Sequence, residues 1–307
     1  MFESTHYLEM PDGTRLAYHL EPSVLNARGI MLISHGLTEH SLRYAAFAKA
    51  MSAAGFHVYA HDHRGHGQTI APGANLGQFA PRDGVAKVIA DIKAMRDFAI
   101  GAYPDLPVVL FGHSMGGLLV LRAATEHPES FNALAVWNSN FNAGLAGHMA
   151  RIVLKIERAL KGSDVPSLIM AKSTFEAWGK SIPNHRTAFD WLSRDAQEVD
   201  TYIADPLCGF PVSVSLWLDL MELTLNTATP ERLSGLPKTL PIHLVGGGQD
   251  PATAKAAATR WLFERMKQSG LRHVSLKIYP DMRHETLNEI GREQAIDEFI
   301  AWATAAV

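Results

Sequence analysis

One serine in the chain lies in a pattern typical of an activated nucleophile. Ser114 stands between Gly112 and Gly116 in the stretch Gly-His-Ser-Met-Gly. Residues 107–111 before it favour a buried strand, and residues 118–124 after it favour a helix. A strand, this turn and a helix hold a serine hydroxyl on a strained turn, beside a helix N-terminus that stabilises negative charge. We predict that Ser114 is a catalytic nucleophile; the alternative is a glycine-rich turn with an incidental serine.

A serine hydroxyl becomes a good nucleophile at neutral pH only beside a base. Where a serine follows a strand in this way, an acid and then a histidine come later in the chain, each in a loop after a strand. Asp250 comes after a predicted strand at 241–245, and His284 after one at 274–279. The carboxyl ends of parallel strands share one edge of a sheet. We therefore predict a triad of Ser114, Asp250 and His284.

Other residues of the same types compete for the roles of acid and base. Asp281 lies on the same short loop as His284, so we interpret it as a turn residue. Asp62 ends an early strand and would break the chain order. The chain has 15 histidines, and only His284 follows the last predicted strand. The other candidates for the base are His113, His127 and His273.

Attack by a serine on a carbonyl also needs two backbone N–H groups for the negative charge that develops on the carbonyl oxygen. One belongs to the residue after the nucleophile, Met115, and the other to the loop after an early strand. His35, Gly36 and Leu37 follow the predicted strand at 29–34. We predict Leu37 and Met115 as oxyanion-hole donors, against the alternative that this loop is a simple turn.

These residues need a scaffold of strands that alternate with helices. Such an alternation is present toward both ends of the chain and predicts an α/β fold, with a mostly parallel sheet flanked by helices. It stops in the middle, where helical patterns dominate. We predict a core of residues 1–139 and 236–307, with a helical cap at 140–235 inserted between two sheet strands. Cap helices are expected at 150–160, 167–177, 186–192 and 212–226.

Composition and charge exclude several classes of protein. The 307 residues are 47% hydrophobic and 19% charged, as in a globular enzyme. A net charge of −3 gives no electrostatic basis for a nucleic-acid partner. Cys208 is the only cysteine, so no disulfide within the chain and no cysteine-based zinc site is expected. No signal-peptide pattern and no apolar run near the ~20 residues of a membrane span is present, so we predict a cytoplasmic protein.

Neither a cofactor nor a metal ion is predicted. The three glycines at 246–248 lack the residues that complete a phosphate-binding loop. Histidines gather between residues 57 and 66, and imidazoles on one loop can bind metals. Arg64 and the glycines beside it favour a packed turn instead. The cluster consists of His57, His61, Asp62, His63 and His66.

Several short motifs are spread along the chain: His35-Gly36, Glu39-His40, Arg43-Tyr44, His61 to Gly67, Gly112 to Gly117, Arg194-Asp195, Ala204 to Leu207, His284-Glu285 and Leu287 to Glu289. Together they resemble those of the monoacylglycerol lipase and bacterial lysophospholipase group of α/β-hydrolases. The resemblance covers nearly the whole chain. It implies an α/β-hydrolase fold, a carboxylic ester hydrolase, and the same triad and oxyanion donors as the chain order does.

We expect a serine carboxylic ester hydrolase that acts on a lipid-like ester, a monoacylglycerol or a lysophospholipid, through an acyl-enzyme. One alternative is another activity of capped α/β-hydrolases, such as proline iminopeptidase or thioesterase. A peptidase needs acidic cap residues for the free amino terminus of its substrate, and Glu176, Glu198 and Asp200 are available. The other alternative is a non-catalytic binding protein on the same fold, and the complete triad argues against it.

The cap sequence contains a basic amphipathic stretch. Ile152, Val153, Leu154 and Ile156 alternate with arginines and lysines. Such a helix suits contact with an anionic membrane, or its apolar face packs on the core or lines the pocket. The number of subunits is left open. Further apolar cap residues fit an acyl channel or the cap's own core: Leu168, Met170, Phe175, Trp178, Leu216, Trp217, Leu220 and Met221.

Overall fold

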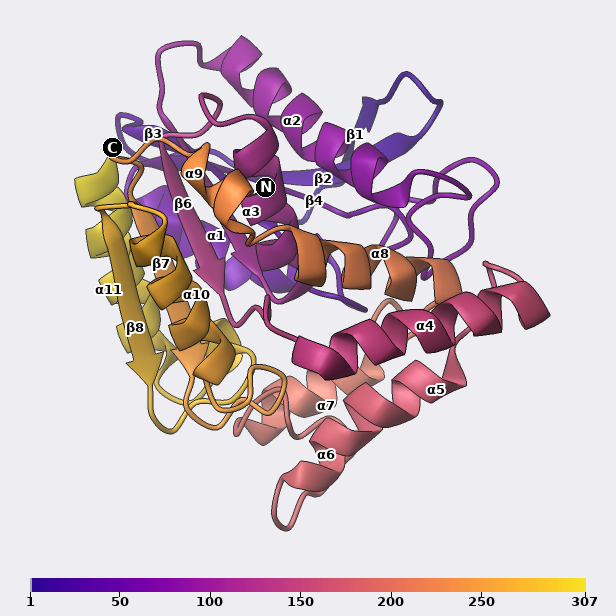
Figure 1. Cartoon of the computed structure of the whole chain (residues 1–307). Helices are drawn as coiled ribbons and strands as arrows, with labels where there is room; N and C mark the ends of the chain where they lie inside the picture. The colour runs from indigo at the N-terminus through magenta and orange to yellow at the C-terminus, as the bar shows by residue number, and fades with distance from the viewer. Residues whose placement is uncertain (1) are drawn as a thin grey trace.

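A central sheet organises the chain, which this computed structural model describes from residue 2 to residue 307 (Figure 1). Its strands lie in the order β1-β2-β4-β3-β5-β6-β7-β8. The pairings from β4 across to β8 are parallel, and β1 and β2 add antiparallel strands at one edge. The predicted mostly parallel sheet is confirmed. The strands are β1 (His6–Glu9), β2 (Arg15–Glu21), β3 (Gly29–Ser34), β4 (Phe56–His61), β5 (Val108–His113), β6 (Ala133–Trp137), β7 (Ile242–Gly247) and β8 (Val274–Tyr279).

Helices cover both faces of the sheet, which explains why its central strands are unbroken apolar runs. In β5, Val108 and Leu110 join the apolar cluster on one face, whereas Val109 and Phe111 join the cluster on the other. Successive side chains of a strand point to opposite faces, so a central strand needs apolar residues at every position. One face carries α2 (Gly84–Ala102), α3 (Met115–Glu126) and α10 (Ala257–Gln268); the other carries α1 (Ala45–Ala53) and α11 (Arg292–Ala306).

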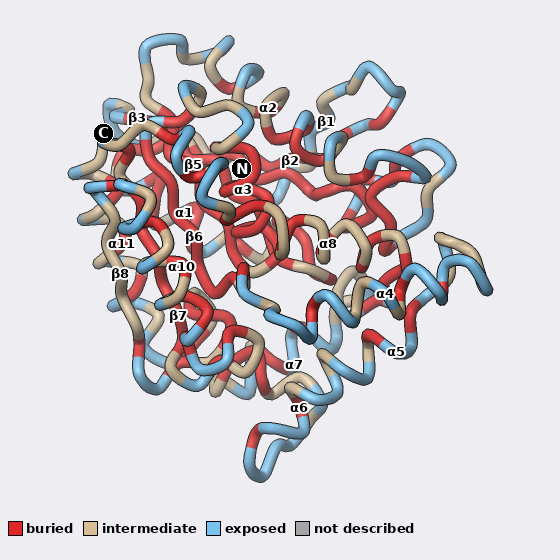
Figure 2. The backbone as a smooth tube through the Cα atoms, viewed as in Figure 1, coloured by how far each residue is buried: buried red, intermediate tan, exposed pale blue. Residues whose placement is uncertain are grey.

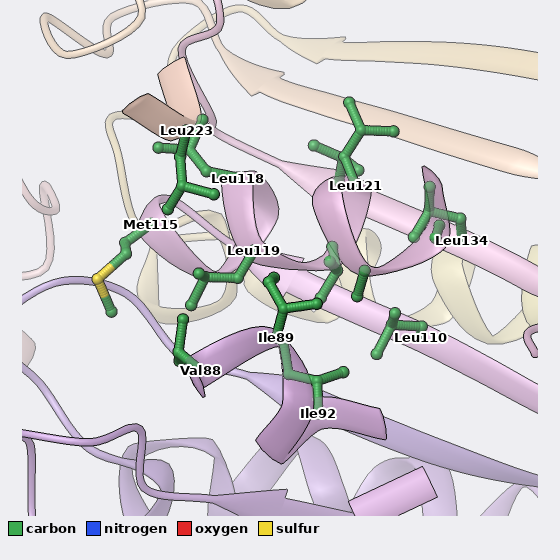
Figure 3. Close-up of a cluster of buried hydrophobic side chains, with 14 of the residues drawn as sticks. Val88, Ile89, Ile92, Leu110, Met115, Leu118, Leu119, Leu121, Leu134 and Leu223 are labelled. Atoms are coloured by element: carbon green, nitrogen blue, oxygen red, sulfur yellow. The ribbon is translucent and has the colours of Figure 1, made fainter. Parts of the chain in front are cut away.

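The larger apolar cluster holds α3 from all sides (Figure 3). Ile89 of α2 lies beside Leu119 of α3, with Ile92 of α2 and Leu110 of β5 next to Ile89. Every residue of α3 from 115 to 124 is buried, because α8 (Val214–Asn226) packs on its outer side. A helix enclosed in this way gives the turn at its N-terminus little freedom to move.

The chain between β6 and β7 is helical. α4 to α7 gather beyond the carboxyl ends of the strands, at the lower right of Figure 1, and α8 runs between them and α3. Figure 2 shows long exposed stretches on α4 to α6, in contrast with the buried sheet. The elements are α4 (Gly144–Lys161), α5 (Leu168–Ala171), the π-helical turn η2 (Lys172–Glu176), α6 (Ala177–Ser181), α7 (Ala196–Ala204), α8 (Val214–Asn226) and α9 (Pro230–Ser234).

The helix predicted at 186–192 is wrong, because these residues form turns. Their backbone carbonyls serve another segment: Trp191 O accepts from the N–H of His284 (3.4 Å), and Leu192 O accepts from the N–H of Glu285 (2.7 Å). Asp190 O accepts from the Arg283 guanidinium (2.6 Å). A helix over these residues would need the same carbonyls for its own ladder. The segment therefore joins the loop after β8 instead of forming a helix.

None of the helices in residues 2–307 combines the length and the apolar character that a membrane span requires.

Candidate active site

Ser114 occupies a strained turn between β5 and α3. Its backbone has φ 55° and ψ −118°, on the side of conformational space that side chains avoid. The two glycines of the motif make the turn possible. A Cβ on Gly112 would collide with the carbonyl oxygen of Gly116, and one on Gly116 would collide with that of Ser34. The Ser114 N–H donates to Trp137 O (2.9 Å), which fixes the turn against β6.

The structure brings together the three residues predicted as a triad. His284 Nε2 lies 2.8 Å from Ser114 Oγ, and His284 Nδ1 lies 2.9 Å from Asp250 Oδ2. The three come from the carboxyl ends of β5, β7 and β8, which share one edge of the sheet. This is the geometry that lets a serine pass its proton to an imidazole held by a carboxylate. The competitor Asp62 is engaged elsewhere, since it accepts from Ser41 N and Oγ.

Asp250 is held as a carboxylate by its surroundings. Burial by itself would raise the pKa of Asp250, but the His284 imidazole beside it and hydrogen bonds from His284, Thr253 and Asn138 lower that pKa below its ordinary value. Thr253 Oγ1 donates to Asp250 Oδ2 at 2.8 Å, and Asn138 Nδ2 at 3.3 Å. An ionised Asp250 fixes the orientation of the imidazole and stabilises its protonated form.

Three residues near this triad escaped the sequence reasoning. They are Asn138 and Thr253, which donate to Asp250, and Trp191, whose ring centroid lies 4.9 Å from that of His284. Asn138 directly follows β6, at the edge where site residues gather, and Thr253 lies three residues after the acid, so both carried a positional signal. Trp191 carried none, because only the tertiary fold brings it to His284.

The two predicted oxyanion donors lie beside Ser114. Leu37 and Met115 line one cavity together with Ser114. Neither N–H donates to any acceptor within residues 2–307, so both are available to a ligand oxygen. Thr38, next to Leu37, has a left-handed backbone (φ 57°), and its carbonyl accepts from the Tyr202 hydroxyl (2.9 Å) of α7. Segment 35–38 is thus tied to the region between β6 and β7.

The cavity that opens on Ser114 has a volume of about 460 Å³ and is mostly apolar. Volumes of this size hold drug-sized ligands. None of its lining residues is a lysine or an arginine. Of the apolar residues considered for an acyl channel, Leu168 is exposed and Leu216 lies in the core, so neither lines it. Six do: Met170, Phe175, Trp178, Trp217, Leu220 and Met221.

Helix α4 divides its apolar side chains between three environments. Val153 lines the cavity and Leu154 is buried in the core. Met149 lines the cavity and is also exposed. The rest of its exposed apolar stripe, with its neighbours in α5, consists of Leu145, Ile152, Ile156, Leu160, Leu168 and Ile169.

In the histidine cluster at 57–66, all members from His61 to His66 are buried at the end of β4 and in the turn after it, whereas His57 is only partly buried. Burial lowers the pKa of His61 and of His66 to about 3, so both rings are neutral at pH 7. Arg64 is buried and pairs with Asp91 at 2.6 Å. Within residues 2–307, one group of possible metal ligands lies within mutual reach; its members, His40, Asp205 and Cys208, do not line the cavity.

The sheet order and the placement of an elbow serine after β5, a carboxylate after β7 and a histidine after β8 define an α/β-hydrolase. The profile of one family, described as "Serine aminopeptidase, S33", matches residues 26–291. The chain belongs to this family.

The chain is also similar to individual proteins and solved structures. The chain is 28% identical over 304 residues to the monoacylglycerol lipase of Mycolicibacterium smegmatis, which covers 97% of this chain and 96% of that protein. It is 28% identical to the human monoglyceride lipase, over 94% of this chain and 87% of that protein. A carboxyl esterase from Bacillus coagulans, solved in complex with glycerol, superposes with a TM-score of 0.87 at 26% identity and 99% coverage of both chains. The predicted resemblance to the monoacylglycerol lipase group is confirmed.

Proposed function

We propose that the protein hydrolyses esters of a long acyl chain with a small neutral alcohol, of the monoacylglycerol type. The observation that carries the proposal is the Ser114–His284 pair, 2.8 Å apart, on the wall of a mostly apolar cavity of about 460 Å³. The names of the relatives support the same substrate class. The apolar lining suits the acyl chain, and the serine suits its ester carbonyl.

In the proposed reaction, Ser114 Oγ attacks the ester carbonyl carbon while His284 Nε2 takes the hydroxyl proton. Asp250 holds the imidazole and stabilises its charged form. The tetrahedral oxyanion accepts hydrogen bonds from the N–H groups of Leu37 and Met115. As the intermediate collapses, the alcohol leaves with the proton from His284, and the acyl group stays on Ser114. Water then attacks the acyl-enzyme with His284 as base, and the fatty acid is released.

The charge of the cavity favours a neutral head group. A lysophospholipid carries a phosphate, and phosphate sites in proteins use arginine, lysine or helix N-termini. Within residues 2–307, no arginine or lysine lines this cavity, and Arg43 beside it is already paired with Glu39 and Glu285, so no free cationic side chain is available to a phosphate. The lining also contains hydroxyls, among them those of Thr38, Ser173 and Thr174, whose oxygens can accept from an alcohol such as glycerol. We therefore favour monoacylglycerol over lysophospholipid.

The test is a hydrolysis panel with butanoyl, decanoyl and hexadecanoyl monoacylglycerols, the matching lysophosphatidylcholines, acyl thioesters and amino-acyl anilides. We expect the monoacylglycerols to give the highest kcat/KM. Ser114→Ala should lower ester turnover by roughly 10⁴-fold or more, because residual catalysis then rests on the oxyanion donors alone. Preference for lysophosphatidylcholine would overturn the assignment of the head group, and a Ser114→Ala variant with wild-type turnover would overturn the mechanism.

The family description gives weight to an aminopeptidase as the second candidate, but the acidic residues considered for it lie elsewhere. Glu198 pairs with Arg292 (2.8 Å) and Asp200 pairs with Arg186 (2.6 Å). Neither of them, nor Glu176, lines the cavity. Turnover of amino-acyl anilides above that of monoacylglycerols would favour this candidate.

We propose that residues 140–235 act as a cap over Ser114 and that α4 brings it to lipid surfaces. The exposed apolar stripe of α4 is flanked by exposed Lys155, Arg158 and Lys161, which suit anionic lipid headgroups. Met149 and Ile169 belong both to the exposed surface and to the cavity lining. A substrate leaving a bilayer at this surface would meet the cavity directly.

A further inference from the structure

A buried ionic bridge lies beside the candidate active site. The guanidinium of Arg43, in the 3₁₀ helix Ser41–Tyr44, donates to Glu39 Oε2 at 2.7 Å. It also donates to both carboxylate oxygens of Glu285, at 2.6 and 2.7 Å. All three side chains are less than a tenth exposed: 9% for Arg43, 4% for Glu39 and 5% for Glu285. The mechanism proposed above uses none of them.

One end of the bridge holds the segment that carries an oxyanion donor. Glu39 Oε1 accepts from the backbone N–H of Gly36 and from the Tyr44 hydroxyl (2.8 Å). Gly36 directly precedes Leu37, so this bond restrains the backbone that presents the Leu37 N–H. Gly36 must lack a side chain here, because a Cβ would come within 2.6 Å of Glu39 Oε1.

The other end holds the segment that carries the base. Glu285 directly follows His284. The His284 carbonyl accepts from His113 Nε2 at 2.9 Å, and His113 Nδ1 lies 3.5 Å from Glu39 Oε1. Burial works against a charged His113, but the Glu39 carboxylate outweighs it and raises the pKa of His113 above its ordinary value. His113 thus contacts the His284 carbonyl with one ring nitrogen and faces the Glu39 carboxylate with the other, so it joins the two segments a second time.

We propose that Glu39, Arg43, Glu285 and His113 form a closed ring that holds the Leu37 backbone and His284 in fixed register on either side of Ser114. The proposal rests on the function proposed above. Arg43 is then a positioning residue: it touches no reacting atom, yet it joins both carboxylates. Burying several charges is costly, and for folding alone an apolar cluster serves as well or better. A catalytic site that needs fixed geometry would explain why charged residues are buried here, since a misplacement of about 1 Å can cost about 10²-fold in rate.

The ring should affect kcat and leave KM nearly unchanged. The bonds that it aligns, from Leu37 to the oxyanion and from Ser114 to His284, strengthen in the transition state, whereas most of the apolar cavity wall comes from residues 140–224, outside the ring. We expect Arg43→Met to lower kcat for p-nitrophenyl butyrate by about 10- to 100-fold, with KM within about threefold of wild type. The kcat of Arg43→Lys should lie between those of the wild type and Arg43→Met, because a lysine keeps the charge but loses the paired bonds to Glu285.

The matched control is Arg122→Met. Arg122 is also largely buried and pairs with Glu126 at 2.6 Å, but it lies toward the other end of α3 from Ser114. We expect this variant to lose melting temperature and to keep the wild-type kcat. If Arg43→Met does not fold, Arg43→Lys and the isosteric Glu285→Gln serve in its place, each with the same expected fall in kcat at constant KM.

Labelling with a fluorophosphonate separates this proposal from the function on which it rests. Wild-type protein labelled at Ser114, with the rate of labelling reduced in the Arg43 variants, supports both. Wild-type labelling and kcat retained in the Arg43 and Glu285 variants, together with a lower melting temperature, would show that the ring is only structural and would overturn the proposal. Wild-type protein that neither labels nor hydrolyses esters would overturn the proposed function, and the positioning role with it.

Discussion

At the residue scale, Asp250, the proposed acid of the triad, depends on hydrogen-bond donors that belong to no sequence motif. Asp250 is fully buried and accepts from Thr253 Oγ1 (2.8 Å), Asn138 Nδ2 (3.3 Å) and its own loop at Ala252 N (2.9 Å). Together with His284 these donors use both carboxylate oxygens. A buried carboxylate keeps its charge only when its oxygens are satisfied in this way.

Thr253→Val tests this dependence. The change keeps the shape of the side chain but removes one donor to a buried carboxylate. We expect a loss of about 1.5–3 kcal/mol in the free energy of unfolding, the usual value of a hydrogen bond to a charged group. We also expect kcat to fall by about tenfold, since the carboxylate is less firmly held against His284.

The control for this change is Thr259→Val, the same substitution on α10. Thr259 is equally buried, but its hydroxyl has no hydrogen-bond partner within residues 2–307. We expect this variant to match or exceed wild-type stability and to keep kcat. Chemical denaturation and ester kinetics on both variants decide the matter; equal effects of the two substitutions would contradict the role given to Thr253.

The residues that sequence could and could not predict differ in one physical respect. Ser114, Asp250 and His284 follow from chain order, because the carboxyl ends of parallel strands must share an edge. Their geometry agrees with that prediction, and their catalytic roles stay a prediction. The pair of Arg43 and Glu285 is separated by 242 positions, and no local pattern joins its members. Such partners are chosen by the packed tertiary structure, which sequence periodicity does not describe.

At the element scale, the strands were predictable and the helices between β6 and β7 less so. β3 and β5 are buried on both faces, so an apolar run identified them. α4 begins at Gly144, six positions before the predicted start. The prediction began too late because Gly144 and Gly147 disfavour a helix locally. Gly147 packs close to Ala143 and Leu225, so α8 stabilises a turn of helix that propensity alone would not.

Replacing Ile152 and Ile156 by glutamate tests the lipid contact proposed for α4. Both side chains are about half exposed, at 50% and 56%, so folding should tolerate the change. We expect the double variant to lose binding to vesicles with anionic lipids in a flotation assay, because apolar insertion and attraction to the headgroups both weaken. Its kcat on soluble p-nitrophenyl butyrate should stay within about twofold of wild type.

Val24→Glu is the control, since Val24 is 70% exposed and lies far along the chain from α4, after β2. It should leave vesicle binding unchanged. The lipid contact would be refuted by wild-type protein that does not float with the vesicles, or by equal flotation of the wild type and the double variant.

At the scale of the whole molecule, buried neutral histidines make stability depend on pH. The pKa of His61 and of His66 falls to about 3 through burial, and burial also lowers the pKa of His63 and His35. In the unfolded chain each ring takes up a proton near its ordinary pKa of about 6.5. Between these values the unfolded state binds more protons, so stability falls as the pH falls.

We expect the free energy of unfolding to have its full value above about pH 7. Below about pH 6 it should decrease by about 1.4 kcal/mol per pH unit for each such histidine. Since domains have only about 5–15 kcal/mol in total, unfolding should follow near pH 4–5. Three groups act in the opposite direction: burial raises the pKa of Asp219 to about 7 and that of Asp91 to about 6, and, against burial, the Glu39 carboxylate raises the pKa of His113. The buried neutral histidines outnumber them. Urea denaturation at pH 7.5, 6 and 5 measures the slope. A stability that is flat across this range would contradict the account.

The pairing of β6 with β7 has a consequence for how substrate preference can diverge. Leu134 is in register with Ile242 and Asn138 N donates to Val245 O, so the two strands are parallel neighbours, and the chain between them crosses from the carboxyl edge of the sheet back to its amino edge. Everything between the two strands can lengthen, shorten or change sequence without altering the order of any strand. The triad residues stand at the strand ends of the sheet, whereas most of the cavity wall belongs to the segment between β6 and β7. We therefore expect that replacing this segment by the corresponding one of a relative changes the substrate preference and leaves the chemistry of the triad unchanged.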